Sequence, residues 1–342
     1  MDKLVGRFLR GVLLVTLVWV GTSTAAAGRA SNPSTLSIQT SARGELVTLR
    51  GKRVYVEVSG PAGAPVLLYL HGGPGTGAYE FSLYQRERLS RHLRLVVMDQ
   101  RGVLRSDALA DDEPFGLQDI IEDCEALRRH LGVRRWSVLG HSFGGVVAVR
   151  YALAYPDAVE KLLLESAPLN FASSACALLQ GAAAEYRAMG KPELAEQCLK
   201  AADAGRPLES LIADSINLTN DLGARRNNLY VHGAEKDFFE RLRAASPFPP
   251  ELWKRNGIHQ GKLFDEGKLF ESVLPRLSEI KCPTLLLKGR YDLAMADDQV
   301  AAFRREVKQG KVVVFRSSGH FIHVEEPVRY ASVVTRFVSA KR

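Results

Sequence analysis

The chain has 342 residues, of which 46% are hydrophobic, 25% are charged and 8% are aromatic. This composition excludes an intrinsically disordered chain and a multi-pass membrane protein, and the length allows either two domains or one domain with an inserted module. The formal net charge is +8, but the basic residues are scattered in short pairs instead of forming a stripe with interleaved aromatic residues. We therefore expect no nucleic acid among the partners.

Residues 1–27 have the pattern of a secretory signal peptide. Three basic residues precede an apolar run over residues 11–20, and small residues before Gly28 offer a cleavage site. The apolar stretch is short and its second half is polar, so we expect no stable membrane span once the signal is removed. The sequence thus predicts an exported protein, periplasmic or secreted, in which residues 28–45 form a flexible lead-in.

From residue 46 onward the hydrophobic pattern predicts alternating strands and helices. The predicted strands of this part are residues 46–49, 54–58, 66–70, 95–98, 136–139 and 162–164, with helices over residues 120–131 and from the end of the fifth strand to Tyr155. The first two strands alternate and form a hairpin, whereas the later ones are near-continuous apolar runs, typical of strands covered on both faces. This order predicts an α/β fold with a mainly parallel sheet and helices on both of its faces.

The pattern changes over residues 168–273, which are rich in Ala, Glu, Lys and Arg and show no strand. Helices are predicted there over residues 173–189, 193–202, 208–222 and 234–244. We interpret this segment as an inserted helical cap. The alternation then resumes with a strand over residues 284–287, a helix near 297–307, a strand over 312–315 and a helix over 327–339. The core of the fold is therefore predicted to consist of residues 46–167 and 274–342.

Residues 140–144 have the pattern Gly-x-Ser-x-Gly between a predicted strand and a predicted helix. In this context the pattern is typical of a nucleophile elbow, in which the flanking glycines let the backbone double back and expose the serine above the sheet. Ser142 is therefore the candidate nucleophile. Because Gly and Ser are common residues, the hypothesis depends on an acid and a histidine elsewhere in the chain.

Asp292 and His320 each come directly after a predicted strand, in the chain order Ser, Asp, His. A serine hydroxyl is a poor nucleophile at neutral pH, so an imidazole has to take its proton and a carboxylate has to hold the imidazole in the right tautomer. The carboxyl ends of parallel strands meet at the edge of the sheet where the elbow also opens. We expect the three side chains of Ser142, Asp292 and His320 to form a catalytic triad there.

Other residues compete for the acid and for the histidine. The competing acids are Asp297, Asp298 and Glu165, and the competing histidines are His71, His141 and His323. Glu165 follows the preceding strand, where some enzymes of this architecture carry the acid. His141 is expected to point away from the serine as its neighbour in the chain, and His323 is expected to be structural.

A tetrahedral oxyanion needs two backbone N–H groups, and the glycine-rich residues 71–75, just after an apolar strand, are placed to supply one. Phe143, immediately after the nucleophile, should supply the other. No phosphate-binding glycine motif and no metal-ligand spacing occurs, so no phosphate site and no metal site are predicted. No cofactor is expected either, because a triad carries out acyl transfer unaided. Of the four cysteines, Cys176 and Cys198 lie on two predicted helices joined by a break, and export would allow them to form a disulfide.

Taken together, these segments resemble the α/β-hydrolases and, among them, the proline iminopeptidase-like serine hydrolases. The likeness is carried by residues 71–75, 99–102, 140–145, 289–292, 318–320 and 325–327. It extends over about residues 46–340. It implies Ser142, Asp292 and His320 as the triad, the N–H groups of Gly73 and Phe143 as the oxyanion donors, and a cis bond between Gly73 and Pro74.

The chain departs from that family in places that concern the substrate. Residues 103–106 are Val-Leu-Arg-Ser where aminopeptidases of the family usually have Cys-Gly-Arg-Ser, and residue 143 is Phe where Trp or Tyr is frequent. Near residues 225–228, where a cap carboxylate would bind the free amine of a peptide, the chain has amides. The acids that could replace it are Asp221, Asp214 and Glu185.

Two functions stay open at this point. The first is an aminopeptidase that removes an N-terminal residue, often proline, from short peptides. The second is an esterase, lactonase or amidase that acts on a small apolar substrate under the same cap. The partner is therefore a short peptide or a small molecule in either case, and the sequence leaves the oligomeric state open.

Overall fold

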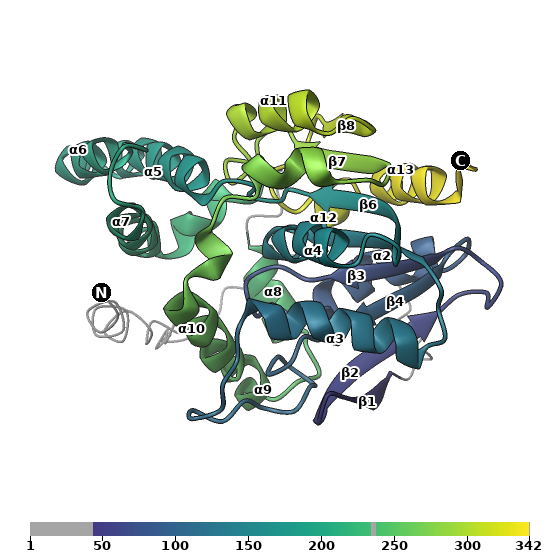
Figure 1. Cartoon of the computed structure of the whole chain (residues 1–342). Helices are drawn as coiled ribbons and strands as arrows, with labels where there is room; N and C mark the ends of the chain where they lie inside the picture. Colours follow the sequence, from purple (N-terminus) through teal and green to yellow (C-terminus); the bar gives the residue numbers. More distant parts are fainter. Residues whose placement is uncertain (1–43, 234–236, 342) are drawn as a thin grey trace, which may run out of the picture.

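The computed structural model describes residues 44–233 and 237–341, and an eight-stranded sheet forms its centre (Figure 1). The strands are β1 (Glu45–Leu49), β2 (Lys52–Ser59), β3 (Val66–Leu70), β4 (Arg94–Met98), β5 (Trp136–His141), β6 (Val159–Glu165), β7 (Thr284–Gly289) and β8 (Gly310–Phe315), in the order β1-β2-β4-β3-β5-β6-β7-β8. β1, β2 and β4 pair antiparallel, and all pairs from β4 to β8 are parallel. The predicted fold class is therefore confirmed. The predicted signal peptide lies outside the described residues.

Side chains of the parallel strands alternate between two cores, one on each face of the sheet. Leu68 and Val138 belong to the core that holds α3 (Leu117–His130) and α4 (Phe143–Ala154). Their neighbours Tyr69 and Leu139 belong to the core that holds α2 (Tyr79–Leu89) and α13 (Pro327–Ser339). Each buried aliphatic side chain contributes about 1.5–3 kcal/mol to the stability of the fold. Strands with apolar side chains at every position therefore stabilise the cores on both faces of the sheet.

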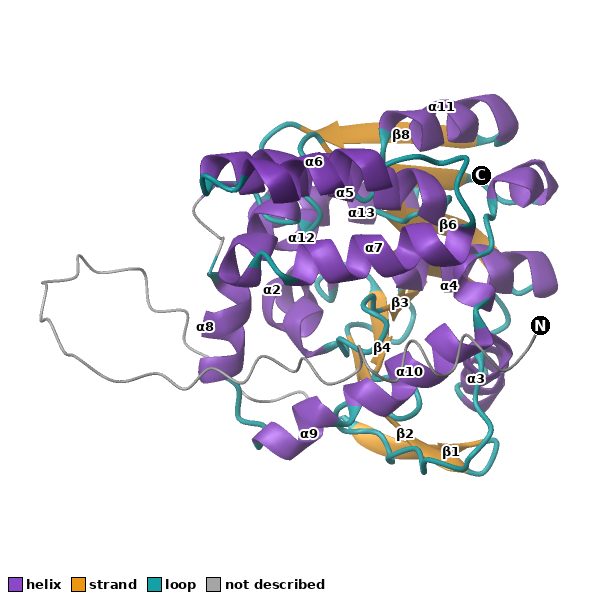
Figure 2. Cartoon of the chain, turned by 90° about the vertical axis from the view of Figure 1, so that its left-hand side faces the viewer, coloured by secondary structure: helices purple, strands orange, loops and turns teal. Residues whose placement is uncertain are grey.

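A helical segment is inserted between β6 and β7. Its elements are α5 (Phe171–Ala188), α6 (Pro192–Ala201), α7 (Leu208–Asn220), η1 (Gly223–Leu229), α8 (Phe238–Ala244), α9 (Pro250–Lys254), α10 (Asn256–Glu266) and the short turns η3 (Lys268–Phe270) and η4 (Leu274–Glu279). Figure 1 shows α5, α6, α7 and α10 on the left of the sheet, and Figure 2 shows them from in front. Helices α5, α6 and α7 enclose an apolar core of their own, which includes Leu179 and Leu211. Asn170 caps α5 by accepting hydrogen bonds from the N–H groups of Ala172 and Ser173.

The two cysteines expected as a possible disulfide are not bonded to each other. All four cysteines are free thiols, so this part of the prediction is wrong. Cys198 is buried as an apolar member of the core between α5, α6 and α7, and the partly buried Cys176 packs against the same core. Adjacent helices can be predicted from sequence, but whether two positions on them face each other closely enough for a disulfide depends on their packing register.

Three α-helices of the described part of the chain were not predicted: α2, α9 and α10. Helix α2 buries polar side chains, including Glu80 and Gln85, so it lacks an apolar stripe. Among the described residues no helix combines the length and the apolar character that crossing a bilayer requires.

Candidate active site

The serine turn between β5 and α4 has the geometry expected of a nucleophile elbow. Ser142 has φ 53° and ψ −125°, a conformation that L-residues adopt only when the surroundings enforce it. A Cβ on Gly140 would lie 2.2 Å from the carbonyl oxygen of Gly144, and one on Gly144 would lie 2.1 Å from that of Leu70. These two positions can therefore only be glycine, and the tight turn leaves Ser142 partly exposed at the carboxyl end of β5.

Asp292 and His320 meet at the same edge of the sheet, each in the loop after a strand. His320 Nδ1 lies 3.0 Å from Asp292 Oδ1, and both side chains are buried. An ionised carboxylate only accepts hydrogen bonds, so Nδ1 of His320 carries the hydrogen and Nε2 faces away from the acid. The two loops are in backbone contact, because a Cβ on Gly289 would lie 1.8 Å from the carbonyl oxygen of Gly319.

The electrostatic surroundings keep Asp292 ionised. Burial alone would raise the pKa of this carboxyl, but the His320 ring, the Lys288 ammonium and the Ser166 hydroxyl together hold it below its usual range. The N–H groups of Ala294 and Met295 also donate to Asp292 Oδ1, at 2.9 and 3.4 Å. Lys288 Nζ donates to the backbone oxygen of Asp292 at 2.8 Å, which fixes the loop itself.

Ser142 and His320 are linked through His141, the residue before the serine. Nε2 of His141 donates a hydrogen bond to the backbone oxygen of His320 at 3.1 Å, and the two rings lie 5.0 Å apart. Burial lowers the pKa of His141 to about 3, so this ring is neutral. In the described part of the chain, no hydrogen bond joins Ser142 Oγ to the His320 ring itself.

The glycine-rich loop after β3 lies against the serine. A Cβ on Gly72 would lie 2.8 Å from Ser142 Cβ, and the bond between Gly73 and Pro74 is cis, as the resemblance implied. The carbonyl oxygen of Gly72 accepts hydrogen bonds from Thr76 N, Thr76 Oγ1 and His71 Nδ1. In the trans peptide between Gly72 and Gly73, the N–H of Gly73 then points in the opposite direction, away from Thr76.

The second expected donor, the N–H of Phe143, belongs to the first residue of α4. The first N–H groups of a helix have no acceptor within the helix, so this group is free to bind an anion. It follows Ser142 directly, and the side chain of Phe143 is buried beneath it. The two N–H groups predicted for the oxyanion thus border the serine from two different segments.

The inserted segment reaches the site through residues 230–232. The N–H of His320 donates to the backbone oxygen of Tyr230 at 2.6 Å, and a Cβ on Gly319 would lie 2.4 Å from that oxygen. Glu325 accepts hydrogen bonds from His232 N at 2.6 Å and from Gly319 N at 2.9 Å. The sequence offered no signal for these contacts, since they are made largely by backbone atoms.

Apart from His141, the competing acids and histidines have hydrogen-bond partners outside the candidate triad. Asp297 and Asp298 are exposed, and Asp298 binds the hydroxyl of Ser173. His71 is buried and is held by Gln100 N and the carbonyl oxygen of Gly72. Glu165 and His323 bind each other, at 2.6 Å between Glu165 Oε1 and His323 Nδ1.

Within residues 44–233 and 237–341, one group has ligand atoms close enough to share a metal ion: His141, Glu165 and His323, within 4.8 Å of one another. The two ring nitrogens of His323 already bind Glu165 and Glu80, and Nε2 of His141 binds the backbone of His320. Hydrogen bonds therefore account for this group without a metal.

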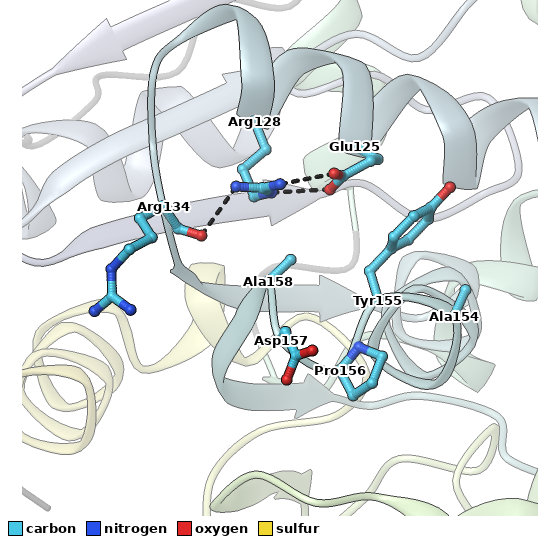
Figure 3. A pocket seen from close by; sticks show the side chains of 8 residues that line it. All are labelled: Glu125, Arg128, Arg134, Ala154, Tyr155, Pro156, Asp157 and Ala158. Carbon is cyan, nitrogen blue, oxygen red and sulfur yellow. Dashed lines mark hydrogen bonds and ion pairs between the residues drawn. The ribbon is translucent and has the colours of Figure 1, made fainter.

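A separate hollow of about 490 Å³ lies near the amino ends of β5 and β6 (Figure 3). It is open to solvent and is lined by Glu125, Arg128, Arg134, Ala154, Tyr155, Pro156, Asp157 and Ala158. Arg134 comes shortly before β5 and Ala158 comes directly before β6, whereas Ser142 follows the other end of β5. This hollow is therefore at the opposite edge of the sheet from the candidate site.

A comparison with known protein families identifies the family to which this chain belongs. The family model described as alpha/beta hydrolase fold matches residues 65–327, well over half of the chain. The protein therefore belongs to the α/β-hydrolase family.

Within that family the chain is proline iminopeptidase-like. It is 25% identical to a proline iminopeptidase of Heyndrickxia coagulans over 293 residues, which cover 81% of this chain and 91% of the relative. A solved structure of a proline iminopeptidase-related protein from Thermus thermophilus has a TM-score of 0.64 at 24% identity, covering 87% of this chain and 98% of that one. An esterase from Exiguobacterium antarcticum has a TM-score of 0.61 at 19% identity, covering 87% and 100%. The last two likenesses concern the fold alone.

Proposed function

We propose that the protein is a serine hydrolase that uses Ser142, His320 and Asp292 in acyl-enzyme chemistry, most like an aminopeptidase of the proline iminopeptidase type. The observation that carries the proposal is the 3.0 Å hydrogen bond between His320 Nδ1 and Asp292 Oδ1, formed at the edge of the sheet where Ser142 is partly exposed on its tight turn. An acid, an oriented imidazole and an exposed hydroxyl are the three groups that acyl transfer requires.

In this mechanism Nε2 of His320 takes the proton of Ser142 as its Oγ attacks the carbonyl carbon of the substrate. Asp292 stabilises the imidazolium that forms, and the N–H groups of Gly73 and Phe143 bind the oxyanion. His320 then gives its proton to the leaving group, and water hydrolyses the acyl-enzyme by the same path. The reaction requires a hydrogen bond between Ser142 and His320, and such bonds frequently tighten only when substrate is bound.

The choice between peptides and esters depends on the cap carboxylates. Asp214 binds Arg206 at 2.7 Å, and Asp221 is exposed at the end of α7. Glu185 instead reaches the predicted amide segment, where it accepts from Asn228 Nδ2 at 2.9 Å and from Arg225 at 3.2 Å. We therefore assign the free-amine contact of an aminopeptidase to Glu185.

The ion pair between Glu185 and Arg225, however, favours the alternative function, an esterase, lactonase or amidase. The carboxylate of Glu185 already has a cation beside it, because Arg225 forms an ion pair with it. A second cation, the amine of a peptide, gains less from a carboxylate that is already paired. An esterase, lactonase or amidase acting on a small apolar substrate needs no such contact and is our second candidate.

Glu185→Gln separates the two functions. For an aminopeptidase, we expect KM for proline-p-nitroanilide to rise on the order of tenfold, because a charged hydrogen bond to the amine is lost. Turnover of p-nitrophenyl butyrate should be unchanged. The esterase would be favoured if the variant and the wild type had equal rates on both substrates and if both turned over p-nitrophenyl butyrate faster than proline-p-nitroanilide.

The reaction class itself is tested with Ser142→Ala. We expect kcat on the preferred substrate to fall on the order of 10⁴-fold or more, since the proposed nucleophile is removed. The matched control is Ser173→Ala, because Ser173 binds Asp298 at the surface, away from the triad. Full activity of Ser142→Ala would rule out both candidate functions.

We also propose that the protein is exported, on the basis of the leader pattern in residues 1–27. Expression of the full chain in a Gram-negative host, followed by fractionation and N-terminal sequencing, tests this proposal. The expected mature protein begins near Gly28 and is found outside the cytoplasm. An uncleaved chain in the cytoplasmic fraction would contradict it.

A further inference from the structure

A buried cluster of charged side chains lies behind the proposed triad and has no part in the mechanism above. Its centre is His323, which lies in the short helix α12 (Ile322–Glu325). The side chain of His323 is fully buried. Nδ1 lies 2.6 Å from Glu165 Oε1, and Nε2 lies 2.5 Å from Glu80 Oε1. Since ionised carboxylates only accept hydrogen bonds, both ring nitrogens donate and the ring is an imidazolium.

The charge balance of the cluster supports this protonation state. Burial alone would lower the pKa of His323, but Glu165 and Glu80 outweigh it and raise the pKa to about 10. Tyr330, from α13, donates its hydroxyl to the second oxygen of Glu165 at 2.7 Å. The buried ring is therefore paired on both sides, which is the condition under which a buried charge is tolerated.

The backbone of His323 is held as firmly as its ring. Its N–H donates to Glu165 Oε1 at 3.2 Å, and its carbonyl oxygen accepts from Gln85 Nε2 at 2.6 Å. All four polar groups of this residue thus bind residues of α2 or β6. A single residue with four such bonds fixes the position of the short helix that contains it.

The same contacts connect His323 to the proposed active site. His320 lies three residues earlier, and the ring of His141 lies 5.0 Å from the rings of both His320 and His323. Glu80 is in the first turn of α2, which follows the oxyanion loop, and Glu165 immediately precedes Ser166, whose hydroxyl lowers the pKa of Asp292. The segment that carries the base, the residue before the nucleophile and the helix after the oxyanion loop therefore all lie next to one imidazolium.

We propose that His323 is a positioning residue for His320: held between Glu80 and Glu165, it fixes α12 and thereby the loop that presents His320 to Ser142. This inference rests on the proposed serine hydrolase function. Precise placement is what the triad needs, because a displacement of about 1 Å at a reacting group can lower the rate on the order of 100-fold.

The test compares Glu80→Leu with Glu80→Gln. The leucine removes the acceptor of His323 Nε2 but leaves the pair between His323 and Glu165, so the variant keeps a neutral buried pair. The glutamine keeps an oxygen that accepts the hydrogen bond. Activity is measured as kcat per active site, with the sites counted by a fluorophosphonate probe that labels the serine.

For Glu80→Leu we expect kcat per labelled site to fall on the order of 10- to 100-fold, with KM changed by less than about twofold. Glu80→Gln should restore most of the loss. A residue that only stabilised the fold would reduce the number of labelled sites and leave kcat per site unchanged. That result for Glu80→Leu overturns the proposal.

Glu125→Leu is the matched control. Glu125 is also a buried carboxylate, and it binds the hydroxyl of Tyr151 and the guanidinium of Arg128 beside the hollow at the opposite edge of the sheet (Figure 3). We expect this variant to lower the melting temperature without changing kcat per labelled site. A loss of kcat per site as large as that of Glu80→Leu would show that any lost buried carboxylate slows the enzyme, and would overturn the proposal.

Failure of the proposed function is recognised separately. If the probe does not label the wild-type protein, the protein is not a serine hydrolase of the proposed kind. Crystal structures of the wild type and of Glu80→Leu then decide the positioning role without turnover. A displaced His320 ring with a broken bond to Asp292 supports it, and an unchanged loop overturns it.

Discussion

At residue 292 a carboxylate and an amide differ little in shape, but they select different tautomers of His320. The carboxylate accepts a hydrogen from Nδ1, which leaves Nε2 unprotonated and able to take the serine proton. An asparagine at this position could donate to Nδ1 and shift the hydrogen to Nε2. We expect Asp292→Asn to lower kcat on the order of 10⁴-fold while KM changes little.

Steady-state kinetics on the preferred substrate measure this effect. The matched control is Asp298→Asn, the same exchange at a neighbouring exposed acid that binds Ser173. We expect that variant to keep its activity. A strong loss in Asp298→Asn with a weak one in Asp292→Asn would mean that the acid is assigned to the wrong residue.

At the same scale, some residues of the candidate site carry a signal in the sequence and others carry none. Ser142 could be located because the elbow has a local motif, and the order of acid and histidine narrowed the remaining choices. From the sequence alone, Glu165 was an alternative candidate for the acid and His323 for the histidine. Only their contact with each other distinguished them from Asp292 and His320. Glu80 had no signal at all, because its partner His323 is 243 residues away in the chain.

At the scale of elements, the turn from β5 into α4 depends on backbone approaches that no other residue type permits. A Cβ on Gly144 would lie 2.1 Å from the carbonyl oxygen of Leu70, so the helix would have to move away from β3. We expect Gly144→Ala to lower the free energy of unfolding by about 1–3 kcal/mol and to reduce activity as well.

Urea unfolding compares this variant with Gly63→Ala. Gly63 has open space around the position of a Cβ and lies in the exposed loop before β3. The control should stay within about 0.5 kcal/mol of the wild type. Equal stabilities of the two variants would mean that the elbow can relax, against the close contact described.

Elements with a regular apolar pattern were predictable, and those that bury polar groups were not. The parallel strands could be recognised from their apolar runs, because both of their faces are covered. Helix α2 escaped recognition because Glu80 and Gln85 are buried in it to bind His323. Helix α10 contains Gly257 and Gly261 and begins without a capping side chain, so its start carries no sequence signal.

At the scale of the whole molecule, buried histidines make stability depend on pH in both directions. Burial lowers the pKa of His141 and of His259 to about 3, whereas histidines of the unfolded chain titrate near about 6.5. Below about 6.5 the unfolded state therefore binds protons that the native state does not, and stability falls as the pH falls. Glu325, with a pKa raised to about 7 by burial, acts in the opposite sense over part of that range, but it is one group against these two and His71, whose pKa burial also lowers.

On the alkaline side His323 determines the trend. Its pKa is raised to about 10 in the folded protein, because Glu165 and Glu80 outweigh the effect of burial. The stability it contributes is fully present below about 6.5 and is lost as the pH rises through about 10. The free energy of unfolding should therefore be largest near about pH 6.5 and decline on both sides.

Urea unfolding at intervals from about pH 5 to about pH 9 measures this profile. In Glu80→Gln one of the two charges that raise the pKa of His323 is absent, so the alkaline decline should be smaller and should end at a lower pH. In His259→Asn one buried neutral histidine is absent, so the acid decline should be shallower while the alkaline side is unchanged. A flat profile for the wild type would contradict the assignment. So would a change of the acid decline in Glu80→Gln or of the alkaline decline in His259→Asn, because groups other than these buried histidines would then govern each side.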